Sequence, residues 1–115
     1  MVRTRDSRER SLRMAVNFRM NTRRKDHNRM VIRISGDFDG NSAWELVNML
    51  FEQSGKYDVV ELDTHGLKRL LPFGKNILLA QAAPLRKSKT PYVVSGPYAE
   101  VLTGSGLFRP EKVDE

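Results

Sequence analysis

Two stretches near the start of the chain alternate between apolar and polar residues. The apolar positions are Met14, Val16, Phe18 and Met20 in the first stretch, and Met30, Ile32 and Ile34 in the second. A period of two residues is typical of a strand with one buried face. Residues 21–28 between them are polar and charged, as in a turn. The pattern predicts strands over 14–20 and 30–35, joined as an antiparallel hairpin.

The apolar spacing changes to that of a helix after residue 40. The apolar residues Ala43, Leu46, Val47, Leu50 and Phe51 recur every three or four positions. Asn41 or Ser42 suits the N-cap, and Glu45 stands three residues after Ser42, as a capping box requires. Gly55 then suits the end of this helix.

Strands and helices alternate through the rest of the chain. We expect an interior strand over 57–62, a connector over 67–73, a helix over 73–87 that Pro84 kinks or ends, a strand over 92–95 and a short helix over 98–102. Right-handed crossovers between successive strands favour parallel pairing. The predicted fold class is α/β: a single domain with a mixed four-stranded β-sheet and about three helices, in the order β-β-α-β-α-β-α, with its helices mostly on one face.

Charge divides the chain unevenly. Residues 1–30 hold ten Lys and Arg against three Asp and Glu, a net charge of +7, whereas residues 31–115 carry −1. Residues 1–13 have few large apolar side chains, so burial would not repay the entropy of ordering them. We therefore expect a basic flexible arm over 1–13, a domain over 14–110 and a polar tail over 111–115.

The basic arm suggests one possible function, the binding of nucleic acid or another acidic surface. Its cationic residues, together with those of the following loop, are Arg3, Arg5, Arg8, Arg10, Arg13, Arg23, Arg24 and Lys25. Such binding would weaken steeply with salt. Residues 1–17 contain no aromatic side chain, so base stacking is not indicated. A solubilising tail without a ligand is the alternative.

Composition and motifs argue against catalysis. The chain has no cysteine, which excludes disulfides, thiolate metal sites and cysteine nucleophiles. Its two histidines, His27 and His65, lack metal-ligand spacing, although Asp63 and His65 would suit a base with its orienting carboxylate. No apolar run is long enough to cross a bilayer, and no secretory leader is expected. We expect a cytoplasmic protein that is not an enzyme and needs no cofactor or metal.

Several short motifs, taken in order, resemble the STAS family, the anti-sigma-factor antagonist and sulfate-transporter-associated domains. The matching segments are Gly36, Phe38 and Asp39 after an apolar strand, Val59 to Asp63 followed by Gly66-Leu67, Gly74 with Ile77-Leu78-Leu79, Tyr92 to Pro97, and Gly104 to Phe108. Together they cover about residues 14–108. The resemblance implies a bacterial protein-binding module that regulates transcription through signal transduction.

The sequence departs from that family at the phosphorylation motif. Phosphorylatable members carry Asp-Ser-Ser/Thr-Gly at the start of the second helix, where this chain has Leu71-Pro72-Phe73 before Gly74. The usual switch, in which phosphate adds negative charge at a helix N-terminus, is therefore not expected here. Thr64 and Ser42 remain as alternative acceptor hydroxyls.

The loop that enters the second helix is the candidate partner-binding site. Its predicted residues are Asp37, Asp39, Lys68, Arg69, Leu71, Pro72, Phe73, Gly74 and Lys75. The resemblance implies a kinase-like anti-sigma factor or another STAS protein as the partner. Phe73 would form an exposed apolar patch there or, equally, cap the core. Trp44 on the first helix is a further candidate for an exposed aromatic anchor.

Overall fold

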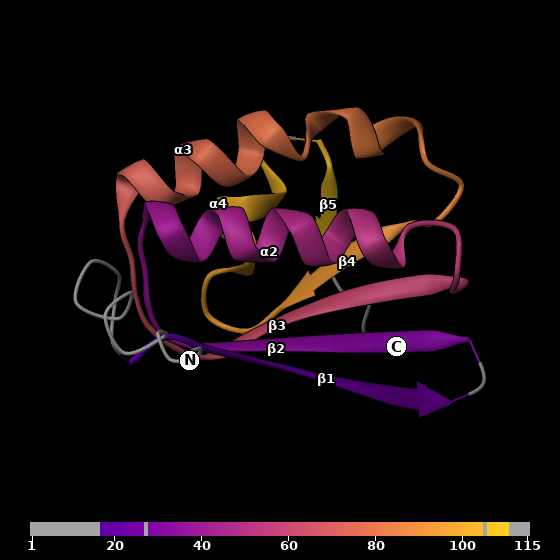
Figure 1. The fold of residues 1–115 in the computed structure, drawn as a ribbon, viewed down its shortest axis with the longest axis horizontal. Helices are drawn as coiled ribbons and strands as arrows, with labels where there is room; N and C mark the ends of the chain where they lie inside the picture. The colour runs from indigo at the N-terminus through magenta and orange to yellow at the C-terminus, as the bar shows by residue number, and fades with distance from the viewer. Residues whose placement is uncertain (1–16, 27, 105, 111–115) are drawn as a thin grey trace, which may run out of the picture.

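The computed structural model describes residues 17–26, 28–104 and 106–110. In chain order the elements are β1 (Arg19–Asp26), β2 (Arg29–Phe38), α2 (Gly40–Gln53), β3 (Val59–Leu70), α3 (Pro72–Gln81), the 3-10 turn η1 (Ala83–Lys87), β4 (Tyr92–Ser95), α4 (Ala99–Thr103) and β5 (Phe108–Pro110) (Figure 1). The expected α/β domain is confirmed, with a fifth strand that the sequence pattern did not predict.

The strands form one sheet in the order β1-β2-β3-β4-β5. The first pair is antiparallel and the remaining pairs are parallel. Each crossover from β2 onwards advances to the next strand in the same direction, so right-handed connections place every helix on the same face. Figure 1 shows α2 and α3 lying side by side above the sheet. Among the described residues, the opposite face of the sheet is free of helices.

The core lies between the helices and the sheet. Its largest fully buried side chains are Phe38, Ile32, Ile34, Leu46, Leu50, Leu62, Leu78, Tyr92, Leu102 and Phe108. The strand members of this set alternate in sequence, since one face of each strand meets the helices. The predicted apolar faces of β2 and α2 are therefore confirmed, except that Phe51 is exposed.

The first strand begins later than predicted. Residues 14–16 of the expected strand over 14–20 lie outside the described residues, and β1 runs from Arg19 to Asp26. The prediction of a loop over 21–28 was wrong, because this polar segment pairs with β2 through register partners such as Arg23 and Val31. An edge strand has one free side and tolerates charged residues there, so its polarity imitates that of a loop.

Three other boundaries also differ from prediction. The strand β3 continues to Leu70, through most of the expected connector over 67–73, because it stays paired with β2 as far as Phe38. The predicted helix over 73–87 divides into α3 and η1, with Pro84 in the first turn of η1. The N-cap of α2 is Asp39 rather than Asn41 or Ser42.

Candidate functional site

The candidate site forms where β2 and β3 end beside the start of α3. Backbone pairing sets Asp37 opposite Arg69, and the Leu71 amide donates to the Phe38 carbonyl oxygen at 3.1 Å. The helix α3 begins immediately after, with Pro72 at its first turn. Parallel strands that end together thus bring the predicted loop residues of three elements to one edge of the sheet.

Asp37 and Arg69 form a bidentate ion pair at this edge. Arg69 Nη2 donates to Asp37 Oδ2 at 3.0 Å, and Arg69 Nε donates to Asp37 Oδ1 at 3.2 Å. The hydrogen bonds from Arg69 lower the pKa of the Asp37 carboxyl, and the charges of Arg69 and Lys68 act in the same direction. Both pair members are therefore engaged with each other at the proposed binding edge.

Asp39 has a structural role in the fold. Its Oδ1 accepts hydrogen bonds from the backbone amide and the hydroxyl of Ser42, both at 2.9 Å. A side-chain oxygen at the N-cap satisfies an amide that the helix itself leaves without a partner. Replacing Asp39 therefore tests the start of α2 as well as any contact with a partner.

The start of α3 combines one exposed aromatic residue with one tightly packed glycine. The Phe73 side chain is 70% exposed, which decides between the two interpretations of this residue in favour of a surface patch. A Cβ placed on Gly74 would lie only 2.7 Å from the carbonyl oxygens of Phe38 and Asp39. Gly74 thus lets α3 approach the end of β2 closely, and this packing presents Phe73 to solvent.

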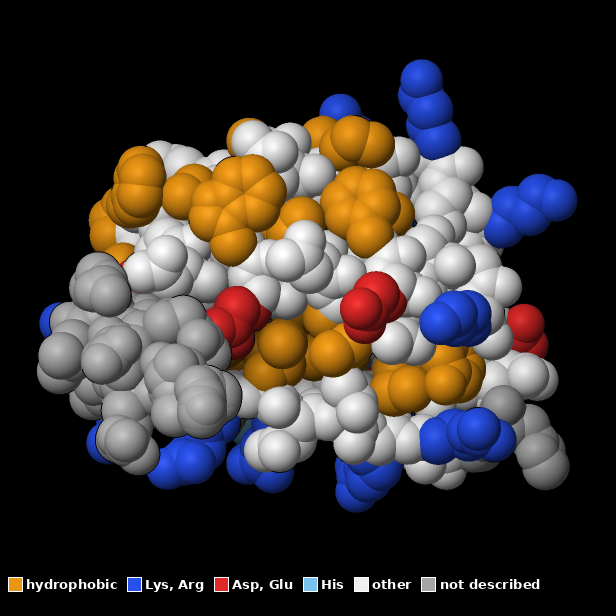
Figure 2. All heavy atoms as spheres, in the orientation of Figure 1, with side chains coloured by type: hydrophobic (Ala, Val, Ile, Leu, Met, Phe, Trp, Pro, Cys, Tyr) orange, Lys and Arg blue, Asp and Glu red, His pale blue; other side chains and the backbone are white. Residues whose placement is uncertain are grey.

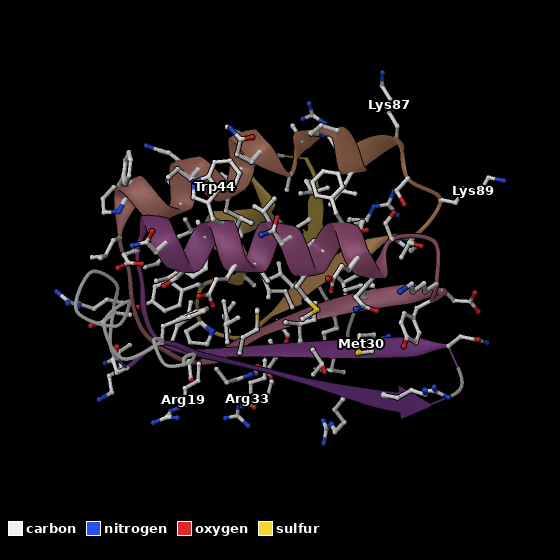
Figure 3. The ribbon with its side chains drawn as sticks, in the orientation of Figure 1. Arg19, Met30, Arg33, Trp44, Lys87 and Lys89 are labelled. Carbon is white, nitrogen blue, oxygen red and sulfur yellow. The ribbon has the colours of Figure 1, made fainter. Side chains whose placement is uncertain are left out.

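Phe73 continues into an apolar surface on α2, which we call the aromatic row and define as Phe73, Trp44 and Phe51. Trp44 is 46% and Phe51 44% exposed. The ring of Phe73 lies over Gly40, where an added Cβ would be 2.9 Å from Phe73 Cε2, and Trp44 is one helical turn further along. Figure 2 shows apolar side chains gathered over the two helices, and Figure 3 shows Trp44 on the helical side of the molecule.

Charged side chains border the aromatic row. Glu45 and Glu52, each next in sequence to an aromatic of the row, are exposed, and Figure 2 shows acidic groups beside the apolar ones. Lys68 is exposed at the end of β3, and Lys75 is half-buried in the first turn of α3. The predicted residues are thus brought together, while Phe51 was missed. Its spacing of seven residues from Trp44 was the signal in the sequence.

The two alternative acceptor hydroxyls are buried. Ser42 has no exposed surface, and its Oγ contacts Asp39 Oδ1. Thr64 is equally buried, with its Oγ1 donating to the Ser95 carbonyl oxygen at 2.7 Å and accepting from the Tyr98 amide at 3.3 Å. Both hydroxyls therefore hold the fold together in this structure, and neither is presented to a kinase.

Asp63 and His65 form the pair that the sequence suggested. His65 Nδ1 and Asp63 Oδ1 are 2.7 Å apart, and the His65 amide also donates to Asp63 Oδ1 at 2.9 Å. Partial burial acts to raise the pKa of Asp63, but the hydrogen bonds from His65, together with the electrostatic attraction of His65 and Arg33, outweigh burial and lower the pKa. The neighbouring hydroxyl of Thr64 is committed to Ser95, so it is not available to this pair as a nucleophile.

The predicted basic residues divide into two groups. Arg3, Arg5, Arg8, Arg10 and Arg13 lie outside the described residues, as do the expected limits of the arm and the tail. Arg23, Arg24 and Lys25 are exposed on β1 rather than in a loop.

Two further classes of site are absent from the described part of the chain. Within 17–26, 28–104 and 106–110, no three His, Asp or Glu side chains gather in a group suited to a metal ion. The helices of these residues are also too short or too polar for any of them to cross a membrane.

Comparison with known proteins shows the fold. No protein-family model matches the sequence, and no curated protein matches it. The structure of the anti-sigma factor antagonist SpoIIAA in its unphosphorylated form matches with a TM-score of 0.50 and 13% identity, covering 83% of this chain and 90% of SpoIIAA. An anti-sigma factor antagonist from Mycobacterium paratuberculosis matches with a TM-score of 0.53 and 22% identity, covering 81% of this chain and 87% of that protein.

A much longer protein contains a similar unit. The structure of Mglu matches with a TM-score of 0.59 and 16% identity over 67% of this chain, but this chain spans only 19% of Mglu. The matches to the two antagonists extend over most of this chain and most of each antagonist. The chain therefore has the SpoIIAA-like STAS fold of anti-sigma-factor antagonists.

Proposed function

We propose that this chain is a non-catalytic regulatory module that binds a protein partner through the aromatic row and the adjoining start of α3. The observation that carries the proposal is the 70% exposure of Phe73 beside exposed Trp44 and Phe51. Exposed aromatic side chains gathered on one face are typical of protein interfaces, where they act as anchors. Glu45 and Glu52 favour a partner with an apolar contact surface flanked by cations.

The fold supports a particular class of partner. Two of the similar structures are anti-sigma-factor antagonists. We infer a kinase-like anti-sigma factor, or another STAS protein, in a bacterial cytoplasmic signalling pathway that regulates transcription. Leu71, Pro72 and Phe73 have no hydroxyl, and the proposed module is therefore not switched by phosphate at the start of α3.

The binding proposal is tested with a partner captured from the native cytoplasm and then purified. Titration calorimetry compares the unaltered chain with Phe73→Asp and with a matched variant, Val101→Asp. Val101 is 47% exposed but lies on α4, outside the aromatic row. We expect Phe73→Asp to weaken binding at least about tenfold, as for an interface anchor, and Val101→Asp to leave it nearly unchanged.

Two results would reject this surface. One is equal binding by Phe73→Asp and the unaltered chain, and the other is an equal loss in both variants. Circular dichroism of each variant checks that it has folded. The absence of a phosphate switch is tested separately by intact-mass measurement of the chain isolated from its own cells, where a stoichiometric phosphate would contradict the proposal.

A further inference from the structure

The helix-free face of the sheet carries a second surface, unrelated to the aromatic row. Register partners in adjacent strands share a face, so Arg19, Arg23 and Arg33 lie on the same side as Val31 and Glu61. The core residues Ile32 and Ile34 point the other way, towards the helices. Figure 3 shows Arg19 and Arg33 directed away from the helical layer.

Positive charge dominates this face over β1, β2 and β3. Alternate residues of each strand share a face, and the register places on this one the cations Arg19, Arg23, Lys25, Arg29 and Arg33 and the anions Glu61 and Asp63. Figure 2 shows basic side chains projecting along the side of the molecule opposite to the helices. Arg19 and Arg23 form no ion pair within the described ranges and are exposed. Their charges are therefore available to an anionic ligand.

Glu61 fixes one of these cations in place. The carboxylate is buried, and its Oε1 accepts from Arg29 Nη2 at 2.9 Å and from Arg29 Nε at 3.2 Å. Its Oε2 accepts from the Ser95 hydroxyl at 2.9 Å. The Lys25 ammonium lies 4.0 Å from Glu61 Oε1. The buried Glu61 therefore holds Arg29 in place on this face, while Arg19 and Arg23 form no ion pair with Glu61.

A cavity opens between two of the exposed arginines. It measures about 330 Å³ and is lined by Asn21, Thr22, Arg23, Val31, Arg33 and Asp63. Arg23 and Arg33 supply guanidinium groups, which bind phosphate oxygens in a bidentate manner. Asn21 and Thr22 are further polar neighbours. The Asp63 carboxylate is held by hydrogen bonds from His65 at the border of this cavity.

From this arrangement we infer that the helix-free face binds the phosphodiester backbone of duplex nucleic acid, with a phosphate group between Arg23 and Arg33. The spacing of Arg19 and Arg23 along β1, about 13 Å, extends the cationic surface beyond one phosphate group. Contacts to phosphate alone give affinity without base recognition, so binding is independent of sequence.

The occupant follows from what this face lacks as well as from its charge. The exposed large apolar residues of the described chain are Trp44, Phe51, Phe73 and Val101, all on helices. Single-stranded nucleic acid is bound by stacking bases on aromatic side chains, and lipid surfaces are anchored by apolar side chains. Over the described residues, this basic face exposes neither an aromatic nor a large apolar side chain, which matches the regular outer charge of a duplex.

Fluorescence anisotropy of a short labelled DNA duplex of mixed sequence tests the inference with the full chain. The charge-reversal pair Arg23→Glu with Arg33→Glu is compared with Lys87→Glu and Lys89→Glu, which change the net charge equally. Lys87 and Lys89 are exposed at another corner of the molecule (Figure 3). Titrations run from about 0.05 to 0.2 M salt.

We expect the unaltered chain to bind with an affinity that falls steeply with salt. The arginine pair should weaken binding at least about tenfold and reduce the slope of log K against log salt by about 2. The lysine pair should change the affinity by less than about threefold, because charges more than a Debye length away are screened. If the arginine reversal disturbs the circular dichroism, Arg23→Gln with Arg33→Gln replaces it and should shift affinity in the same direction.

Four outcomes would overturn the inference. One is that the unaltered chain binds neither the duplex nor the vesicles named below, and another is equal loss in the arginine and lysine pairs. A third is unchanged binding by the arginine pair, which would assign the affinity to other cations. The fourth is binding to equimolar phosphatidylserine and phosphatidylcholine vesicles without binding to the duplex, which would make the ligand a membrane surface.

Discussion

Gly74 approaches Phe38 so closely that a Cβ at position 74 would lie 2.7 Å from the Phe38 carbonyl oxygen. The contact joins the start of α3 to the end of β2, and backbone atoms on that side cannot yield as a flexible side chain would. The exposure of Phe73 depends on this contact, because Gly74, the residue after Phe73, determines how closely α3 packs against the sheet.

Gly74→Ala should therefore lower the free energy of unfolding by about 1–3 kcal/mol, the range for forcing an extra methyl group into a packed site. Gly104→Ala is the matched change, because a Cβ there has only a carbonyl oxygen at 3.8 Å. Urea unfolding of both variants checks the prediction. Equal stability of Gly74→Ala and the unaltered chain would contradict the close approach.

The N-cap of α2 leads to a second prediction. Asp39→Ala removes the acceptor of the Ser42 amide and should cost about 1 kcal/mol of stability, whereas Asp39→Asn should retain most of it. Thermal and urea unfolding measure both. If Asp39→Asn and Asp39→Ala were equally destabilised, the capping role would be wrong, and the aspartate charge would be the stabilising feature.

The ion pair between Asp37 and Arg69 makes the free energy of unfolding depend on pH. The pKa of Asp37 is lowered by Arg69 below its ordinary value of 3.8, so the unfolded chain takes up the proton first as pH falls. The pair therefore stabilises the fold above that value and loses its effect as pH falls through the folded pKa. Arg69→Ala should raise the Asp37 pKa towards its ordinary value, as followed by carboxyl NMR titration.

Exposure limits the size of that effect. Pairs in contact with solvent contribute little to stability, so Arg69→Ala should change the pKa clearly and the unfolding free energy only slightly. Lys68→Ala, which changes a neighbouring charge without a hydrogen bond to Asp37, should move the Asp37 pKa less. An Asp37 pKa that is the same in Arg69→Ala as in the unaltered chain would show that the ion pair does not form in solution.

Asp63 provides an independent test of duplex binding by the helix-free face of the sheet. Its carboxylate lines the cavity between Arg23 and Arg33, where it opposes an incoming phosphate. Asp63→Asn should therefore tighten duplex binding severalfold, and Glu52→Gln, which removes the same charge from exposed α2, should have little effect. Anisotropy titrations at one salt concentration compare them. Weaker binding by Asp63→Asn would contradict the placement of the phosphate.

The sequence predicted most of the fold where one periodicity persists along an element. The apolar alternation of Met30, Ile32 and Ile34 identifies β2, and the spacing of Leu46 and Leu50 identifies α2. Periodicity could not identify residues 21–26 as a strand. They belong to an edge strand in which residues 21–25 are all exposed, so no alternation of buried and exposed positions marks them. The extension of β3 past Asp63 was equally hidden, because irregular register with β2 breaks its alternation.

The candidate site was predicted in its location but not in its full extent. The resemblance at Gly74 and the lack of a hydroxyl at Phe73 directed attention to the start of α3. Phe51 was counted among the apolar positions of the helix because it follows Val47 by four residues, and this spacing cannot show how wide the buried stripe of the helix is. The side of α2 that faces solvent is decided by its packing against α3, which depends on residues far away in the sequence.

Trp44, the single tryptophan of the chain, reports directly on the proposed protein interface. Because its side chain is 46% exposed, its emission should shift to shorter wavelength, and acrylamide should quench it less, when a partner covers the aromatic row. A Trp-free version of the partner isolates this signal. Duplex DNA should leave the emission unchanged, since the helix-free face lies on the side of the sheet opposite to Trp44. Partner binding that left both emission and quenching unaltered would place the interface elsewhere, whereas a response to DNA alone would show that the two surfaces are not independent.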